Sequence, residues 1–147
     1  MNKIALQKVL MSQQESLIRA IQERIESSNT MSDIDETDTI DPEDFSHQTE
    51  AGELKIVFEQ KLKKAQADLE VLRKIDFSPK KTAESGAIIT TENFHFLLGF
   101  ASIPFDFENK KIVGISIDSP IYSFIKGKTK GDTFSYSSNN YQILNIN

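Results

Sequence analysis

The 147-residue sequence contains no cysteine and no tryptophan. Without cysteine the chain has no disulfide, no thiolate zinc site and no cysteine nucleophile. No apolar run approaches the roughly 20 residues that a transmembrane helix needs. The first residues, MNKIALQKVLMSQQES, lack the continuous apolar stretch and the small-residue cleavage site of a signal peptide. We therefore expect a cytoplasmic protein with no membrane partner.

Basic residues are missing from one long segment. Between Arg24 and Lys55 there is no Lys or Arg, and residues 25–54 hold ten carboxylates. The rest of the chain has 17 basic and 12 acidic groups, which makes it mildly positive although the whole chain has a formal charge of −5. Nucleic-acid binding by wrapping needs a continuous basic surface. The pattern instead favours a locally positive partner or a metal ion for the acidic segment.

Two amphipathic helices are predicted in the first half, with no glycine or proline inside the first. The first helix covers residues 2–27 and ends at Ser27–Thr30, and the second runs from Pro42 to Ile75. The predicted apolar seam of the first helix is Leu10, Gln14, Leu17, Ile18, Ile21 and Ile25, and that of the second is Ala51, Leu54, Phe58, Leu62, Ala65, Leu69 and Leu72. These three- and four-residue steps are typical of coiled coils, so the helices should pair antiparallel into a finger roughly 40 Å long.

The second half changes to a strand pattern. Segments rich in Ile, Phe, Tyr and Thr alternate with Gly, Asn or Asp, as in short strands. They are GAIITT, HFLLGF, KIVGISI, DTFSY and YQILNI. A short helix is predicted from Ser119, with Pro120 at its first position and Gly127 after its last turn. The predicted fold class is therefore α+β: a coiled-coil finger over 1–77, a linker over 78–85, and a small antiparallel sheet with one helix over 86–147.

The stretch DIDETDTIDPEDF, residues 33–45, contains seven carboxylates. An EF-hand interpretation would use Asp33, Asp35 and Thr37, but Asp38 then stands where the calcium loop requires glycine. Asp41 before Pro42 is a well-formed helix start, which the helix dipole favours. Residues 33–40 are interpreted as a self-repelling acidic connector.

Other candidate catalytic groups are isolated. His47 lies near the acidic stretch and His95 lies in a strand pattern, and both are interpreted as surface or packing residues. Ser119 lacks the Gly-x-Ser-x-Gly context of a nucleophile and is interpreted as a helix cap. No glycine-rich phosphate loop is present. The chain is therefore not expected to be an enzyme.

Residues 115–146, ISIDSPIYSFIKGKTKGDTFSYSSNNYQILNI, resemble the C-terminal domain of the Gre family of bacterial transcription elongation factors. The shared pattern is a strand, "SP" opening a short helix, "GK…GD", and two final strands. The paired helices resemble the coiled coil of the same family. The resemblance implies an FK506-binding-protein-like C-terminal domain that docks on RNA polymerase. Its implied docking residues are Ser119, Pro120, Gly127, Lys128, Gly131 and Asp132.

The resemblance also implies a mechanism. The coiled coil enters the secondary channel of RNA polymerase in DNA-templated transcription complexes, close to the 3′ end of the nascent RNA. Its acidic tip helps to hold a second Mg²⁺, so that the polymerase cleaves its own backtracked transcript. The implied tip residues are Asp41, Glu43, Asp44 and Glu50, with Asp41 and Asp44 as shared Mg²⁺ ligands. No cofactor is expected on the monomeric factor alone.

The tip admits two alignments with the family. One matches Asp44 and Glu50 and places His47 where the family has a second carboxylate; the other pairs Asp41 with Asp44. A regulator of the same fold that occupies the channel without promoting cleavage, or inhibits, is therefore the alternative. Prolyl-isomerase activity would follow from fold analogy alone and is not favoured.

Overall fold

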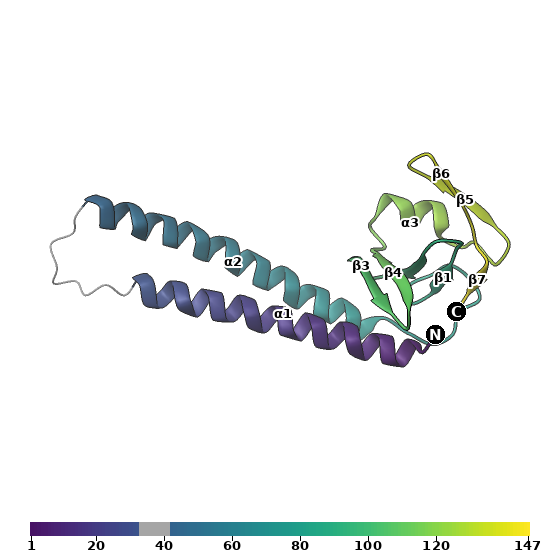
Figure 1. The fold of residues 1–147 in the computed structure, drawn as a ribbon, viewed down its shortest axis with the longest axis horizontal. Helices are drawn as coiled ribbons and strands as arrows, with labels where there is room; N and C mark the ends of the chain where they lie inside the picture. Colours follow the sequence, from purple (N-terminus) through teal and green to yellow (C-terminus); the bar gives the residue numbers. More distant parts are fainter. Residues whose placement is uncertain (33–41) are drawn as a thin grey trace. The chain divides into compact units, whose positions relative to one another are not determined.

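The computed structural model describes residues 1–32 and 42–147, and only the backbone of residues 30–32, 42–49 and 51 (Figure 1). It divides into two compact units. One comprises Met11–Glu70, and the other comprises Met1–Leu10 together with Val71–Asn147. The predicted fold class is confirmed: an N-terminal helical hairpin precedes a mainly antiparallel sheet with one short helix. The domain boundaries predicted from the sequence stay a prediction.

The hairpin consists of α1 (Lys3–Ser32) and α2 (Pro42–Lys74). The predicted break at Ser27–Thr30 is wrong, because α1 continues to Ser32. The hydroxyl groups of Ser27 and Ser28 donate to the carbonyls of Glu23 and Arg24, each at 3.0 Å. Serine can satisfy its hydroxyl within a helix in this way, so the pair does not end the helix.

Within the unit Met11–Glu70, a buried polar contact joins the two helices. The side-chain amide of Gln14 is buried and donates to the carbonyl of Ala65 at 2.9 Å. An amide buried between apolar residues needs such a partner, so the bond favours one register of the helices. Gln14 was correctly predicted as part of the seam.

Two predicted seam residues are instead exposed. Leu17 is 48% exposed, and Ile18 lies closer to the packed face. Leu54 is 54% exposed. At 100° per residue, the two four-residue steps from Leu62 back to Leu54 turn the side chain by about 80°. Residues that repeat at this spacing therefore rotate away from the contact face of a straight helix.

The main sheet lies in the second unit and has the strand order β3-β4-β2-β1-β7. Its strands are β1 (Ile88–Thr90), β2 (His95–Leu98), β3 (Ser102–Phe107), β4 (Lys110–Ile115) and β7 (Asn145–Ile146). All neighbours are antiparallel except β2 and β4, which run parallel. The parallel pair arises because β3 takes the sheet edge, so that β4 returns beside β2 in the same direction.

The sequence patterns did not predict β3. The strand contains Pro104, and its register with β4 shifts between Ser102 and Phe105. Proline is tolerated in a sheet at an edge or a bulge, and β3 offers both. β3 is therefore a strand that the list of predicted strands lacked.

A second, two-stranded sheet pairs β5 (Thr133–Tyr136) with β6 (Asn139–Gln142). YQILNI was predicted as one strand, but it divides at the fully buried Ile143. There the backbone exchanges bonds with Gly131 and Asp132, and the next amide, that of Leu144, donates to Thr90. The chain thus changes pairing partner from β5 to β1 within two residues.

The core of this unit lies between the main sheet, the β5–β6 pair and α3 (Pro120–Ile125). The Tyr141 ring stacks on Phe134 with ring centroids 5.0 Å apart and meets Phe96 edge-on. Such pairs add to the burial of apolar area. The buried members of the core are Ala83, Ala87, Ile89, Phe96, Leu98, Ile115, Ile125, Phe134 and Ile143.

Candidate functional site

The "SP" of the Gre-like motif forms the start of α3. Ser119 occupies the N-cap position with extended backbone, and Pro120 is the first helical residue, as predicted. The Ser119 hydroxyl makes no cap hydrogen bond; its carbonyl accepts the amide of Tyr122 at 3.0 Å. Proline fits here because its fixed φ suits the first turn and its missing N–H has no helical partner. The pair therefore has a local structural role in turning the chain from β4 into α3.

The "GK…GD" part of the motif is a loop whose backbone conformation requires glycine. Gly127 has φ of 77° and Gly131 has φ of 94°, in the region that side chains disfavour. The Gly127 amide donates to the carbonyl of Ala83 at 2.9 Å, and the Gly131 amide donates to Ile143 at 2.8 Å. The two glycines thus place the loop against two other segments of the unit.

Asp132 closes the same loop. Its Oδ2 accepts the backbone amide of Thr129 at 2.7 Å and the Thr129 hydroxyl at 3.1 Å. The hydrogen bond from the Thr129 backbone amide is the main reason that the pKa of this carboxyl lies below its ordinary value. Asp132, although exposed, is therefore an internal cap of the turn.

The loop brings lysines from two distant segments together. Thr82 and Thr129 form an isolated antiparallel bridge, and the amide of Ala83 donates to the carbonyl of Lys128 at 2.8 Å. Lys81 and Lys130 therefore lie at the same end of the bridge. We call Lys81, Lys126, Lys128 and Lys130 the lysine cluster. Three of these lysines are close together in the sequence KGKTK, whereas Lys81 is brought near this segment only by the bridge between Thr82 and Thr129.

An aromatic pair with one exposed ring, that of Phe124, lies next to this loop in the chain. Phe124, on α3, is 52% exposed and packs against Tyr136 of β5 with ring centroids 6.2 Å apart. Its neighbour Ile125 is fully buried and anchors the helix to the core. Adjacent residues of a helix point about 100° apart, so burial of Ile125 turns Phe124 outward. The helical position could have suggested this exposure, but sequence reasoning missed it.

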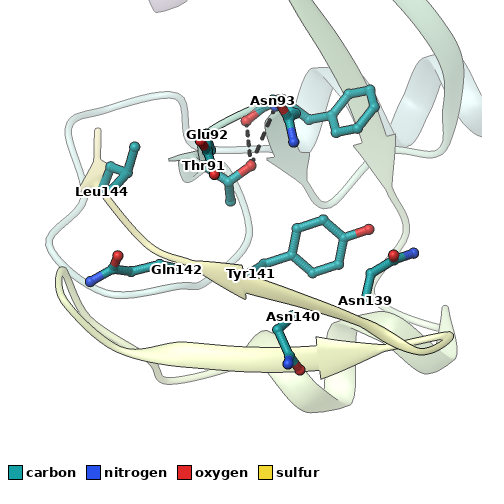
Figure 2. Close-up of a pocket in the computed structure, with 9 residues that line it drawn as sticks. Thr91, Glu92, Asn93, Asn139, Asn140, Tyr141, Gln142 and Leu144 are labelled. Atoms are coloured by element: carbon teal, nitrogen blue, oxygen red, sulfur yellow. Dashed lines mark hydrogen bonds between the residues drawn. The ribbon is translucent and has the colours of Figure 1, made fainter.

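A polar cleft of about 520 Å³ lies between β6 and the turn Thr91–Phe94 (Figure 2). The turn is held by Thr91, whose hydroxyl donates to the Phe94 carbonyl at 2.9 Å. Figure 2 shows the Tyr141 side chain between β6 and this turn. Glu92 is the one titratable acid or base that lines the cleft besides the tyrosine, and amides make up most of the rest. This lining contains no nucleophile paired with a base.

Lys3 is buried and was missed by sequence reasoning. Its ammonium group donates to the carbonyls of Ser78 at 2.7 Å and Asn147 at 2.9 Å. Burial, followed by the positive charge of Lys80 and opposed by Asp76, lowers the pKa of Lys3 to about 8. The contacts tie the start of α1 to the linker and to Asn147, the residue after β7, which is a structural role.

The predicted tip residues are only partly described. Asp41 and the acidic connector lie outside the described residues, and so do the side chains of Glu43, Asp44 and His47. The helix α2 begins at Pro42, as the capping pattern predicted. Glu50 is exposed on α2. Among the residues that are described, no three His, Asp or Glu side chains are grouped to hold a metal.

No helix among the described residues is long and apolar enough to span a bilayer. A scan against models of known protein families finds no match, and no curated protein matches the sequence. The similar solved structures include the following two. GreA factor homolog 1 (Gfh1) of Thermus thermophilus is 14% identical, with 93% of this chain and 94% of that chain covered and a TM-score of 0.35. A structure of the transcription factor Gfh1 is 15% identical, with 92% of each chain covered and a TM-score of 0.36. We draw no functional conclusion from similarity at this level.

Proposed function

We propose that this chain is a Gre-like accessory factor of bacterial RNA polymerase. It binds in the secondary channel as a cytoplasmic monomer and promotes cleavage of backtracked transcripts, without being an enzyme itself. One observation carries the proposal: the stretch that resembles the Gre C-terminal domain folds as β4, a Ser-Pro-initiated α3, a glycine loop and a hairpin. The same chain contains a pair of long helices.

The length of the helices is the second support for this proposal. The 33 residues of α2 correspond to a length of about 50 Å at 1.5 Å per residue. The connection between α1 and α2 contains the densest run of carboxylates in the sequence. A long helical pair can therefore carry negative charge into a narrow channel while the sheet unit remains outside.

The proposed chemistry needs carboxylates but not a complete metal site. Mg²⁺ prefers six oxygen ligands and retains several waters, so Asp41 and Asp44 would supply only part of its coordination. The polymerase would supply the rest. Two metal ions stabilise the attacking and leaving oxygens in phosphodiester hydrolysis. Glu43 and Glu50 would add negative charge near the same end of α2.

The test is transcript cleavage in a stalled, backtracked elongation complex with Mg²⁺. The natural chain should shorten the RNA from its 3′ end, and Asp41→Ala/Asp44→Ala should abolish the effect. Asp33→Ala/Asp35→Ala is the matched control, since it removes the same charge from the same acidic stretch. Unchanged cleavage by the Asp41/Asp44 variant, or equal losses in both variants, would contradict the tip assignment.

A non-cleaving regulator of the same channel is the second candidate. The observation that favours it is His47, which takes the place of a family carboxylate in one alignment of the tip. This function predicts binding to core polymerase with slowed or unaltered cleavage. Failure of purified core polymerase to retain the protein would reject both candidates.

A further inference from the structure

The strand β6 is paired along only one of its edges. It forms a continuous antiparallel register with β5, and no other strand of the described chain pairs with it. The turn between the two strands has φ of 52° at Ser137 and 67° at Ser138, which is typical of a type I′ hairpin. This turn fixes which backbone groups of β6 face β5 and which face away from it.

The backbone groups of β6 alternate between its two edges. In a two-residue hairpin the pair next to the turn, here Tyr136 and Asn139, exchanges both hydrogen bonds, and the next pair exchanges none. The amides and carbonyls of Asn140 and Gln142 therefore point away from β5. In the part of the chain that the structure describes, these four groups make no hydrogen bond to another backbone group.

The residues that follow β6 have the same alternation. The amide of Ile143 donates to Asp132, on the β5 side, at 2.9 Å. The amide of Leu144 donates to Thr90 of β1, on the other side, at 2.8 Å. At Thr90 the strand β1 ends, and the turn Thr91–Phe94 leads back into β2. The free edge of β6 therefore extends past the point where β1 could pair with it.

The polar cleft of about 520 Å³ lies along this edge. All four residues of β6 line the cleft, with the turn Thr91–Phe94 on the opposite side (Figure 2). The Tyr141 ring, which stacks on Phe134, supplies an aromatic wall. The Asn140 side chain accepts a hydrogen bond from the Ser135 hydroxyl at 2.5 Å, so it is held on the β5 side and leaves its own outward backbone uncovered.

The free edge lacks the features that usually prevent addition of another strand. Natural edges are protected by lysine, proline or a bulge. The sequence of β6, NNYQ, contains no charge and no proline, and its register with β5 has no shift. N–H and C=O groups that recur every second residue match the backbone of an extended polypeptide, whose own groups repeat with the same spacing.

We propose that β6 binds an extended peptide segment of another protein, which adds to the β5–β6 sheet as a third strand. Asn140 and Gln142 provide the backbone hydrogen bonds, and the Tyr141 ring and the side-chain amides of the cleft contact the side chains of the segment. Glu92 is the one charged residue of the cleft, so neutral or basic side chains are favoured over acidic ones. This inference goes beyond the proposed function, and its test requires no polymerase.

A second copy of this chain is a less favoured occupant. Its own β6 has the turn Thr91–Phe94 beside the same edge, so two such edges would meet with a turn on each. A separate extended segment has no such obstruction. A sugar would use the side-chain amides of the cleft, but it would leave the alternating backbone groups without a role.

The probe is a peptide of about seven residues, selected on the full chain from a random display library and then synthesised. Amide hydrogen exchange is measured by NMR. Without peptide, the amides of Asn139 and Tyr141 should exchange slowly because they are bonded to β5, and those of Asn140 and Gln142 should exchange rapidly. A saturating peptide should slow the second pair about tenfold or more. Unchanged exchange of this pair, or a library that yields no retained peptide, would overturn the proposal.

A second measurement replaces single backbone N–H groups of the peptide by N-methyl groups. Pairing along one edge predicts a two-residue alternation, in which methylation at every second position weakens binding about tenfold and methylation between these positions has little effect. Loss of binding at none of the positions, or equally at all of them, would contradict strand addition.

The protein side is tested with two variants of one residue. Gln142→Pro removes an outward N–H and leaves the ladder to β5 intact, since proline is tolerated where its nitrogen faces away from the partner strand. It should weaken peptide binding about tenfold. Gln142→Ala is the matched control, which loses only the side chain and should bind like the natural chain. Tyrosine fluorescence in urea shows whether both variants keep the sheet unit folded.

Two further results would assign the cleft to another occupant. Equal losses of peptide binding in Gln142→Pro and Gln142→Ala would indicate recognition through the side-chain amide and not through the strand edge. Self-association of the natural chain in sedimentation, abolished by Gln142→Pro, would assign the edge to a second copy. Either result would overturn the proposal and leave the proposed function untouched.

Discussion

A series of three glycine-to-alanine substitutions gives a quantitative test of the structure. The chemical change is the same each time, but the expected free energies of unfolding differ in sign and size. Gly52 lies in α2 with ordinary backbone and nothing within 4 Å of an added Cβ. Alanine is about 1 kcal/mol better than glycine inside a helix. Gly52→Ala should therefore stabilise the helical hairpin by about that amount.

Gly131 has the same free space but a different backbone. An added Cβ would meet nothing within 4 Å, whereas φ is 94°. A left-handed conformation costs an ordinary residue roughly 1–2 kcal/mol. The reduced entropy of the unfolded chain returns about 0.4–1 kcal/mol of this. Gly131→Ala should therefore destabilise the sheet unit by about 1 kcal/mol.

Gly114 has ordinary backbone but no space. An added Cβ would lie 2.6 Å from the Ser102 amide nitrogen and would overlap the carbonyl oxygen of Phe100. Both are backbone atoms, so relief requires β3 to move away from β4. Overpacking of this severity costs about 3 kcal/mol or more. Gly114→Ala should be the most damaging of the three variants.

Urea unfolding can follow the two units separately. All three tyrosines, at positions 122, 136 and 141, lie in the unit that contains the sheet, and the chain has no tryptophan. Tyrosine fluorescence therefore reports that unit, while far-UV circular dichroism is dominated by the long helices. A cost for Gly131→Ala equal to that of Gly114→Ala would refute the separation of strain from overlap. Destabilisation by Gly52→Ala would refute the helical assignment.

Three further predictions follow from single contacts. Because the pKa of Asp132 is lowered in the folded state, its contribution to the free energy of unfolding is present above an ordinary carboxyl pKa of 3.8 and is lost as pH falls through the folded pKa. Below pH 5, the urea midpoint should therefore fall less with pH for Asp132→Asn than for the natural chain. The pKa of Lys3, lowered from 10.5 to about 8, means that the unfolded chain binds more protons between these values. Stability should rise with pH in this window, and Lys3→Met should remove the rise. Ser138 has φ of 67° in the β5–β6 turn, so Ser138→Gly should raise the free energy of unfolding by about 0.5–1 kcal/mol. An equal gain with Ser138→Ala would contradict this explanation.

Local features were the predictable part of the fold. The start of α2 at Pro42, the start of α3 at Pro120 and the loop glycines follow from the backbone preferences of proline and glycine. Helical periodicity identified the long helices, and strand periodicity identified most of the strands. These signals lie within a few neighbouring residues, so a single sequence contains them. The carboxylate-rich connection between the helices is likewise a property of the sequence alone.

Long-range pairing was not predictable. The strand β3, which contains Pro104, was not among the predicted strands; the structure places it at the sheet edge, where proline is tolerated. Leu17 and Leu54 match the apolar period but are exposed, because only the partner helix determines which face is covered. For the same reason YQILNI appeared to be one strand although Ile143 joins two different pairings.

For the Gre-like C-terminal motif, too, some features follow from the sequence and others only from the tertiary structure. Sequence alone identified Ser119, Pro120, Gly127, Lys128, Gly131 and Asp132 as a motif. Tertiary structure assigns the glycines and Asp132 to the conformation of the loop, brings Lys81 beside Lys130, and leaves Phe124 exposed. Backbone preferences act within a few residues and are written in the sequence. The neighbours of a charge or a ring depend on pairing across dozens of residues, and only the folded chain determines them.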